Sequence, residues 1–571
     1  MPPQAGPVSG AAAGAEARAT ARPRYRSLAI LGGLTVFALA LFAAFWLIDY
    51  FLIDAGAAHR KDGPVGQLFD YDAQTMQNAL GSLSQVIASV LGIAITVVSI
   101  VVQLAATRYT PRVADLFFRD RINIGVMGFF VVACVESVWV SFVVRADYVP
   151  QATVTLTVVM SSASLLLLVP YFAYVFDFLD PEKVIARIGQ QTLDRATTRQ
   201  EPSKGSLNLP RRLRWAKPSS VNASANAGAR RRSFTDRQAQ AVSGLAHLAD
   251  IAVNAMGQKD KVIASDASAA LRRLLVDYQT RKERLEPEWF AIGAPLQADP
   301  DFVALADDSL QELARNRTWL EWKGLRQVRE VFGAALSSVP EMAHVVTIDT
   351  RYVGEAALAA GNRDVFAMVV KFMNTYLRAA LNARDVRTAY NVLNQYRQLA
   401  EALLAAPRDA DRWSSTTLVE VAAHFKYYAR LAHGNGLGFV TETAAYDLCA
   451  LCEAASAHQS DCQDRLLQIF LQIDDAPETP DEERALRGVR KAQAKLATYY
   501  LSAGESARAQ AIFDDMAAES PERLRSIRDE MLAVTAKDFW EVVDRGANFD
   551  YLPAPRKDHL RAFFSRFPSL S

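Results

Sequence analysis

Three cysteines and a histidine in the second half of the chain have a spacing that could hold a metal ion. The series C-x2-C-x5-H-x3-C is formed by Cys449, Cys452, His458 and Cys462. Thiolates and imidazoles are ligands that Zn²⁺ prefers, but the segment has a helical apolar pattern and lacks the glycines and aromatic residues of a zinc knuckle. We therefore predict buried free cysteines and no metal site. A redox-active pair at Cys449 and Cys452 is the alternative.

One carboxylate, Glu136, lies well inside the apolar runs that fill the first 180 residues, and no Lys, Arg or His lies within those runs to neutralise it. Such an acid must be protonated, bonded to a neighbour or exposed to water. Serines at similar depth are Ser89, Ser161 and Ser162. Glu136 is thus either a neutral residue that bonds helices together or a proton or cation site.

Small and polar residues recur every three or four positions along the second apolar run, which places them on one face of a helix. They are Ser82, Gln85, Ser89, Gly92, Thr96, Ser99 and Gln103. This polar stripe favours one of two roles. It could pack closely against another helix, or it could face water in an oligomeric pore or transport path.

Nothing in the sequence points to catalysis. The other histidines form no cluster with Ser, Cys or Asp at a recognised spacing, and neither a phosphate-binding glycine loop nor a GxSxG turn is present. We therefore expect that the chain is not an enzyme and uses no cofactor.

Four apolar runs are long enough to cross about 30 Å of hydrocarbon. They cover residues 28–53, 83–104, 124–144 and 154–176 of the 571-residue chain. The first is too long for the apolar core of a cleaved signal peptide, so we interpret it as a span. Arginines gather before the first run, between the second and third, and after the fourth. This asymmetry predicts that both termini lie in the cytoplasm.

Residues 84–121 resemble the signature of a bacterial predicted membrane protein family, domain of unknown function 2254. The positions that carry the resemblance are Gln103, Ala105, Ala106, Tyr109, Pro111, Arg112, Asp120 and Arg121. Residues 243–275 are similar to the first soluble helices of that family, although residues 256–260 depart from its Pro-Gly-Asn-Asp-Pro type turn. The resemblance covers roughly the first half of the chain. It implies a four-helix membrane module and no reaction.

Residues 200–233 are rich in Pro, Ser, Asn and Gly and carry eight basic residues against one acidic residue. Such a segment cannot bury a core. We predict a flexible linker, which follows a juxtamembrane helix and whose charge suits the anionic inner leaflet. Nucleic acid is not expected as a partner because no known reader motif accompanies the charge.

The remaining chain has helical periodicity and no convincing strand pattern. Helix starts are expected at Asp236, Asp364, Thr416 and Pro480, and breaks at residues 434–438 and at Gly504. One segment resembles a tetratricopeptide repeat, whose positions are filled by Leu496, Ala497, Tyr500, Ala509, Phe513 and Pro521. A repeat needs neighbours to bury its face, so further helix pairs are expected, and their surface would bind a protein. An ordinary helical bundle with chance spacing is the alternative.

We therefore predict an all-α chain in which a four-helix transmembrane module precedes a cytoplasmic, solenoid-like helical domain. The expected parts are a tail (1–26), the membrane module (27–180), the juxtamembrane helix and linker (181–233), a helical domain (234–345) and a helical-repeat domain (346–571). The first hypothesis is a homo-oligomer in the lipid bilayer whose second span lines a channel or transport path. The second is a non-conducting anchor that presents a protein-binding scaffold.

Overall fold

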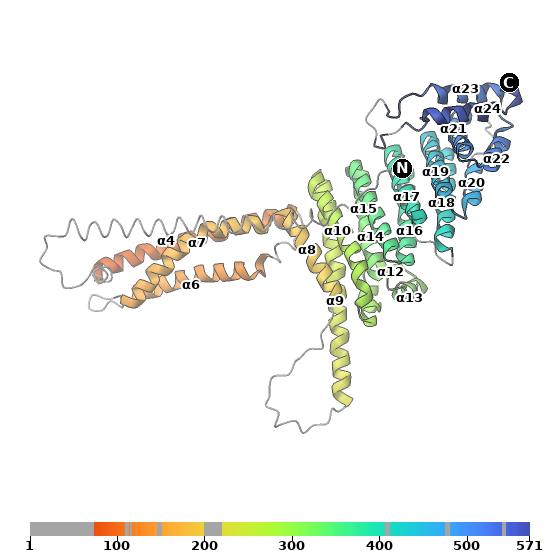
Figure 1. Cartoon of the computed structure of the whole chain (residues 1–571). Helices are drawn as coiled ribbons and strands as arrows, with labels where there is room; N and C mark the ends of the chain where they lie inside the picture. The colour runs from red at the N-terminus through yellow and green to blue at the C-terminus, as the bar shows by residue number, and fades with distance from the viewer. Residues whose placement is uncertain are drawn as a thin grey trace. The chain divides into compact units, whose positions relative to one another are not determined.

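The computed structural model describes residues 73–108, 114, 117–144, 151–198, 220–405, 412–473, 480–539, 544–546 and 548–570 (Figure 1). These described residues form helices and no strand, which confirms the all-α prediction. The chain divides into two compact units, residues 1–184 and residues 185–571. The first predicted span, residues 28–53, and the tail before it lie outside the described residues.

Three long apolar helices form the described part of the first unit: α4 (Ala73–Arg108), α6 (Arg121–Val143) and α7 (Gln151–Phe178). Each is long and apolar enough to cross a membrane, and they correspond to the second, third and fourth predicted spans. Large apolar side chains stay exposed on these helices, among them Phe142, which is 75% exposed, and Trp139, which is 67% exposed. A hydrocarbon surrounding would remove this surface from water.

The three helices alternate in direction. Leu80, near the start of α4, packs with Val140 and Val144 at the end of α6 and with Val154 at the start of α7. One end of the unit therefore holds the start of α4, the end of α6 and the start of α7. The other end holds the end of α4, the start of α6 and the end of α7.

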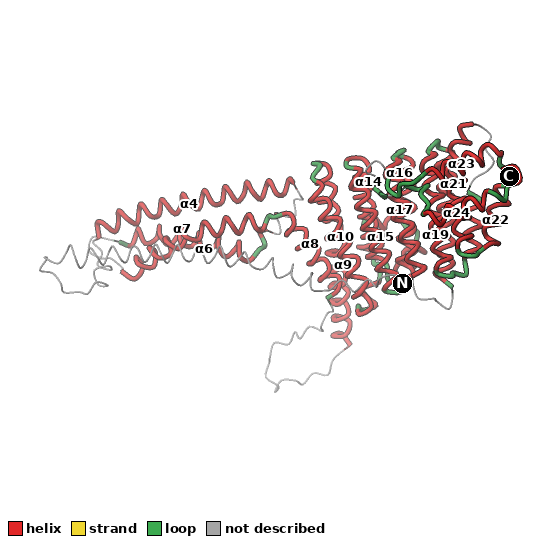
Figure 2. The backbone as a smooth tube through the Cα atoms, turned by 45° about the horizontal axis from the view of Figure 1, so that its top comes forward, coloured by secondary structure: helices red, strands yellow, loops and turns green. Residues whose placement is uncertain are grey.

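The second unit is an array of helix pairs in two layers (Figures 1 and 2). One layer contains α9 (Ser220–Gly257), α14 (Trp319–Ser338), α16 (Arg363–Asn382), α18 (Trp413–Gly434), α20 (Gln463–Leu471) and α22 (Ser506–Met516). The other contains α10 (Lys261–Arg281), α15 (Pro340–Ala359), α17 (Val386–Ala405), α19 (Gly438–Ala457), α21 (Pro480–Ser502) and α24 (Ala554–Phe564). Each helix packs on its sequence neighbour and on the next helix of its own layer, as in a solenoid.

The other helices of the described residues are mostly shorter. They are α8 (Pro181–Thr197), η3 (Lys282–Arg284), η4 (Pro287–Phe290), α11 (Ala294–Gln297), α12 (Pro300–Val303), α13 (Asp307–Arg315), α23 (Pro521–Ala533) and η5 (Pro568–Leu570).

Two predicted boundaries differ from the structure. Helix α9 begins at Ser220, so residues 220–233 are helical where a flexible linker was expected, and Asp236 lies inside this helix. The segment is rich in alanine and arginine, which are good helix formers, and it continues directly into a helix with a buried face. The expected boundary between residues 345 and 346 falls inside α15, and the array continues across it as one unit.

The turns of the array repeat one hydrogen-bond pattern. A residue with positive φ follows each of seven described helices, at Lys259, Arg317, Gly361, Arg384, Gly436, Gln459 and Gly504. The next residue donates its N–H to a carbonyl five positions back, as in Asp260 to Ala255 (2.8 Å) and Glu505 to Tyr500 (2.8 Å). This is the Schellman motif, in which glycine is the least strained residue at the positive-φ position.

A Lys259→Gly variant is therefore expected to be more stable than the wild type by about 0.5 to 1 kcal/mol, because the exposed Lys259 has φ 59° and glycine removes that strain. Gly504→Ala is the reciprocal change at φ 78°, and it should cost about 1 kcal/mol although no atom crowds the added Cβ. Thermal unfolding of the full chain in detergent, followed by circular dichroism, measures both. Shifts of the same sign would contradict this account of the turns.

Candidate functional site

Helix α4 has two sharply different faces. Its buried residues are apolar: Leu80, Ile87, Ala94, Val98, Val102 and Ala105. All seven residues of the polar stripe are exposed: Ser82, Gln85, Ser89, Gly92, Thr96, Ser99 and Gln103. At 3.6 residues per turn the two sets lie on opposite sides of the helix. The stripe therefore faces neither α6 nor α7.

Three hydroxyl groups of the stripe donate hydrogen bonds to carbonyl groups of α4 itself. Ser82 donates to the Asn78 carbonyl (3.0 Å), Ser89 to the Gln85 carbonyl (2.8 Å) and Thr96 to the Gly92 carbonyl (2.8 Å). This back-bonding satisfies each O–H donor and leaves hydroxyl lone pairs outward. The side chains of Gln85 and Ser99 make no hydrogen bond within the described part of the chain. The stripe thus presents acceptor oxygens and an amide at its surface.

Small polar residues that do pack between helices lie on α6 and α7. Ser137, Thr157, Ser161 and Ser164 are all buried. Ser137 donates to the Cys134 carbonyl (2.8 Å) and Ser161 to the Thr157 carbonyl (2.6 Å). Such residues let transmembrane backbones approach closely. Within the described spans, the packing role considered for the α4 stripe is filled by this second set.

Glu136 is half-buried on α6. Among the described residues it has no hydrogen-bond or ion-pair partner, and two of the three serines named for it bond elsewhere. Ser89 and Ser161 both donate to carbonyls of their own helices. The structure therefore shows no hydrogen bond that joins Glu136 to Ser89 or Ser161.

A partly buried polar network joins α6 to α7 at the end of the unit where α4 ends. Asp120 caps α6 by accepting the N–H groups of Ile122 (2.9 Å) and Asn123 (3.3 Å), and the Tyr174 hydroxyl also donates to its carboxylate. The Tyr171 hydroxyl donates to the Asn123 side-chain carbonyl (2.8 Å), while the Asn123 amide donates to the Phe117 carbonyl (3.2 Å). The network fixes the start of one span against the end of another.

Of this network, only Asp120 was singled out by the sequence. Asn123, Tyr171 and Tyr174 were missed. A signal existed, because an amide residue directly before an apolar run and two tyrosines three positions apart near the end of another are unusual beside hydrocarbon. Arg121 is the first residue of α6 and is exposed. Tyr109, Pro111 and Arg112 lie outside the described residues.

Replacing Tyr171 with phenylalanine is expected to destabilise the membrane unit by about 1 to 2 kcal/mol, since it leaves the buried Asn123 carbonyl without its donor. Tyr174→Phe is the matched control. It should cost less, because Asp120 keeps two backbone donors. Heat denaturation of the two variants in the same detergent gives the comparison. A Tyr174→Phe loss equal to or above the Tyr171→Phe loss would refute the ranking.

The repeat-like residues of the helical unit lie mostly in its core. Leu496, Ala497, Tyr500 and Ala509 are fully buried between α21, α22 and their neighbours. The Phe513 ring packs on Phe567 with centroids 4.4 Å apart, and Pro521 begins α23. The helix-turn-helix itself is present as α21 and α22, while the tetratricopeptide assignment stays a prediction. The four buried side chains hold the array together and do not form its surface, whereas Pro521 is exposed.

The three cysteines of the series in the second half are buried free thiols. Burial raises the pKa of the Cys449 and Cys452 thiols well above the ordinary value, so both are held protonated. His458 caps the end of α19, with Nδ1 2.9 Å from the Ala454 carbonyl oxygen. Among the described residues, no three His, Cys, Asp or Glu side chains are grouped to hold a metal ion.

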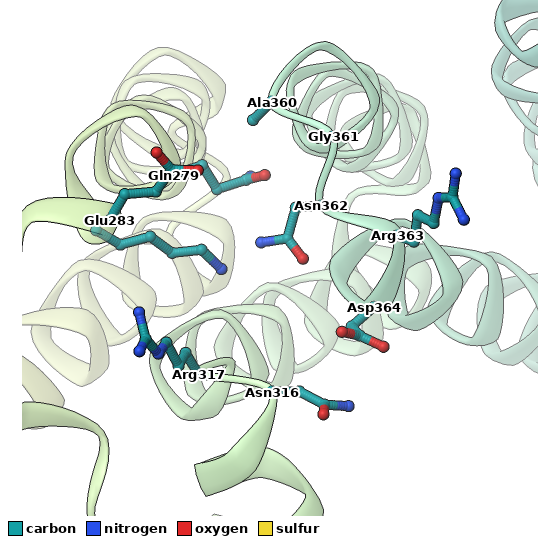
Figure 3. Close-up of a pocket in the computed structure, with 10 residues that line it drawn as sticks. Gln279, Glu283, Asn316, Arg317, Ala360, Gly361, Asn362, Arg363 and Asp364 are labelled. Atoms are coloured by element: carbon teal, nitrogen blue, oxygen red, sulfur yellow. The ribbon is translucent and has the colours of Figure 1, made fainter. Parts of the chain in front are cut away.

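The helical unit also has a polar pocket of about 350 Å³ where the end of α10 meets two turns of the array (Figure 3). It is lined by Gln279, Lys282, Glu283, Asn316, Arg317, Ala360, Gly361, Asn362, Arg363 and Asp364. Figure 3 shows Arg317 and Asn362 reaching from different turns toward the same space, whereas Arg363 points away. The lining contains no serine, cysteine or histidine, so it offers polar contacts without a nucleophile of these kinds.

Comparison with known proteins bears on the first unit. Residues 26–233 match the sequence model of a family described as "Predicted membrane protein (DUF2254)", which confirms the resemblance for the N-terminal part of the chain. No curated protein matches the chain. A solved structure titled "Circular tandem repeat protein with novel repeat topology and enhanced subunit contact surfaces" is similar with a TM-score of 0.24 and 14% identity, over 87% of this chain and 96% of that one.

Proposed function

We propose that this membrane protein, whose residues 26–233 match the family model, assembles as a homo-oligomer around a polar permeation or transport path lined by α4. The observation that carries the proposal is the outward direction of the α4 stripe, opposite the apolar face on which α6 and α7 pack. We assign the chain no enzymatic reaction, catalytic residue or cofactor.

Exposure of the stripe to lipid would carry a high free-energy cost. Hydrocarbon offers no partner to the Gln85 amide or to the outward lone pairs of the stripe hydroxyls, and an unsatisfied polar group there costs several kcal/mol. The stripe must therefore meet other polar groups or water. Copies related by cyclic symmetry would bring the same face of each α4 to a common axis.

The stripe is also long enough to line a path across the whole membrane. From Ser82 to Gln103 the helix rises roughly 30 Å at 1.5 Å per residue, which equals the thickness of the hydrocarbon core. A single packing contact needs one or two turns of small residues. A path across the membrane needs polar groups along its whole length.

Glu136 is the residue that we assign to selectivity or proton coupling. It is a half-buried acid in the middle of α6 without a partner among the described residues. Intramembrane acids without a cation commonly mark proton or cation pathways. We place the protein in the inner membrane with both termini in the cytoplasm, since the arginine-rich segments fit the positive-inside rule.

Cysteine accessibility tests the α4 path. In a chain whose native cysteines are replaced, Ser89→Cys, Thr96→Cys and Ser99→Cys should react with a membrane-impermeant thiol reagent. The matched controls are Val86→Cys and Ile95→Cys, which are also exposed on α4 but flank the stripe on its two apolar sides. They should stay unmodified in lipid. Uniform protection of the three stripe positions would contradict a water-filled path.

A second candidate function is a non-conducting anchor that presents a scaffold for protein partners. The two-layer array favours it, because α15, α17, α19 and α21 lie side by side and offer an extended face. Under this alternative the helical unit carries the activity and the spans only hold it at the membrane.

A further inference from the structure

The connection between α23 and α24 is a long loop. It comprises residues 534–553, here called the strap, of which 534–539, 544–546 and 548–553 are described. The Asn548 N–H donates to the Lys537 carbonyl (2.9 Å) and closes the neck of this loop. The described part of the strap contacts α17, α19 and α21, three neighbouring helices of one layer.

The tip of the strap is held on α17 by charged groups. The Asp544 carboxylate accepts hydrogen bonds from Arg387 Nε (2.9 Å) and Nη2 (3.0 Å) and from Asn391 Nδ2 (2.8 Å). The next residue, Arg545, binds Asp447 of α19 through both ends of its guanidinium, at 2.8 and 3.1 Å. Its Cζ also lies 4.1 Å from the centroid of the Tyr390 ring. A bidentate arginine–carboxylate pair of this kind contributes both binding energy and geometric specificity.

The returning half of the strap is held on α19 and α21. The Phe549 ring stacks on Tyr446, with centroids 4.8 Å apart and planes at 13°. The Asp550 carboxylate accepts from Lys491 Nζ (2.9 Å) and from the Tyr446 hydroxyl. An acid, a base, an aromatic ring and a second acid are thus each matched by a complementary side chain of the array.

This face does not need the strap for its own charge balance. Asp447 keeps Arg397 of α17 as a partner at 3.1 Å when Arg545 is removed. Arg387 is 65% exposed on its helix and would simply be hydrated. The helices under the strap also pack directly on one another. The strap therefore occupies a recognition surface that is complete without it.

We propose that the face of α17, α19 and α21 is a binding site for an extended segment of a partner protein, and that the strap occupies it as a built-in competitor. The partner segment would carry an acidic–basic pair and an aromatic–acidic pair with three residues between them, as residues 544–550 do. Solenoid faces take extended peptides in this way, with charged and aromatic anchors at intervals. The proposal deepens the scaffold function and rests on it.

The test uses the full chain in detergent and a fluorescein-labelled peptide with the sequence of residues 541–552. The strap competes at the high effective concentration of a tethered ligand, so the wild type should bind the peptide weakly. Arg545→Ala, which loosens the strap, should bind it at least tenfold more tightly. Arg561→Ala, an exposed arginine on α24 paired with Asp558, is the matched control and should behave as the wild type. A peptide with alanine at the Arg545 position should bind none of them.

A second variant keeps the test informative if Arg545→Ala does not fold. Asp544→Ala combined with Asp550→Ala removes two outer contacts of the strap and should also raise peptide affinity at least tenfold. Peptide affinity unchanged in both folded variants would overturn the proposal, as would loss of the folded helical signal in both, because a releasable strap cannot be required for folding. Conversion of Arg545→Ala to a dimer through exchanged straps would assign the face to a second copy. The assay needs no pore and no cellular partner, so its failure removes this face and leaves the scaffold function to other surfaces.

Discussion

Replacing Lys282 with methionine is expected to destabilise the helical unit by about 3 to 5 kcal/mol, the range for breaking a buried ion pair from one side. Lys282 Nζ donates to Glu321 Oε1 at 2.6 Å, and the Glu321 side chain is 0% exposed. The second carboxylate oxygen of Glu321 has no hydrogen-bond partner in the described chain. Removing the ammonium group therefore leaves a buried charge with no cation to balance it.

The loss should depend on pH. Burial raises the pKa of Glu321, and the Lys282 charge and hydrogen bond partly oppose this effect. The Lys282→Met variant lacks this charge and this hydrogen bond. The pKa of Glu321 in the folded state therefore rises further above its value in the unfolded chain. A raised carboxyl pKa stabilises the fold below the unfolded value and loses that contribution as pH rises through the folded value. The deficit relative to wild type should thus be larger at pH 8 than at pH 5.

Urea unfolding of the full chain in detergent, followed by circular dichroism at both pH values, measures this difference. The double variant Lys282→Met with Glu321→Leu is the control, since it removes both charges and should recover most of the lost stability. An equal deficit at pH 5 and pH 8, or no recovery in the double variant, would contradict the assignment of the effect to an unpaired carboxylate.

Gly244→Ala is the second substitution with a large expected effect, because a Cβ at this position of α9 would lie 1.9 Å from Thr192 Oγ1 and 2.8 Å from its Cγ2. Thr192 lies on α8, is buried and donates to the Ile188 carbonyl (2.7 Å). Rotation of one side chain cannot relieve the clash, since Thr192 Cβ is also only 2.9 Å away. The two helices must separate. We expect a net loss of about 3 kcal/mol, at the upper end for overpacking.

Gly257→Ala is the matched control for this change. It lies at the end of the same helix, and no atom stands within 4 Å of its added Cβ. That variant should be neutral or slightly stabilising, since alanine is the better helix former. Adding Thr192→Ala to Gly244→Ala should restore part of the stability. Thermal unfolding and limited proteolysis of α8 provide the readout, and wild-type behaviour of Gly244→Ala in both would show that the close approach is absent in solution.

The membrane spans and the polar face of α4 could be predicted because both depend on local spacing. An apolar run of 20 residues has few soluble explanations, and seven small or polar residues at steps of three and four must share one helix face. The partner of a span could not be predicted in this way. Asn123 and Tyr171 are 48 residues apart, and only the alternating direction of α6 and α7 brings them together.

The helical unit shows the same limit. Breaks at residues 434–438 and at Gly504 were predictable, because glycine suits the positive-φ position of a helix end. The start of α9 was missed because the Pro- and Ser-rich stretch before it hid the change to alanine and arginine at Ser220. The contact of Arg545 with Asp447 joins residues 98 positions apart, and no local sequence pattern predicts it.

The most direct test of the central claim is ion and proton flux through purified protein reconstituted into liposomes. We predict flux under an imposed gradient, with Glu136→Gln and Gln103→Leu each lowering the rate by about tenfold or more, the size expected when a polar group that stabilises the permeating species by about 1.4 kcal/mol is removed from the path. The absence of flux under every ion and proton gradient, together with a monomeric mass in detergent, would contradict an oligomeric path lined by α4.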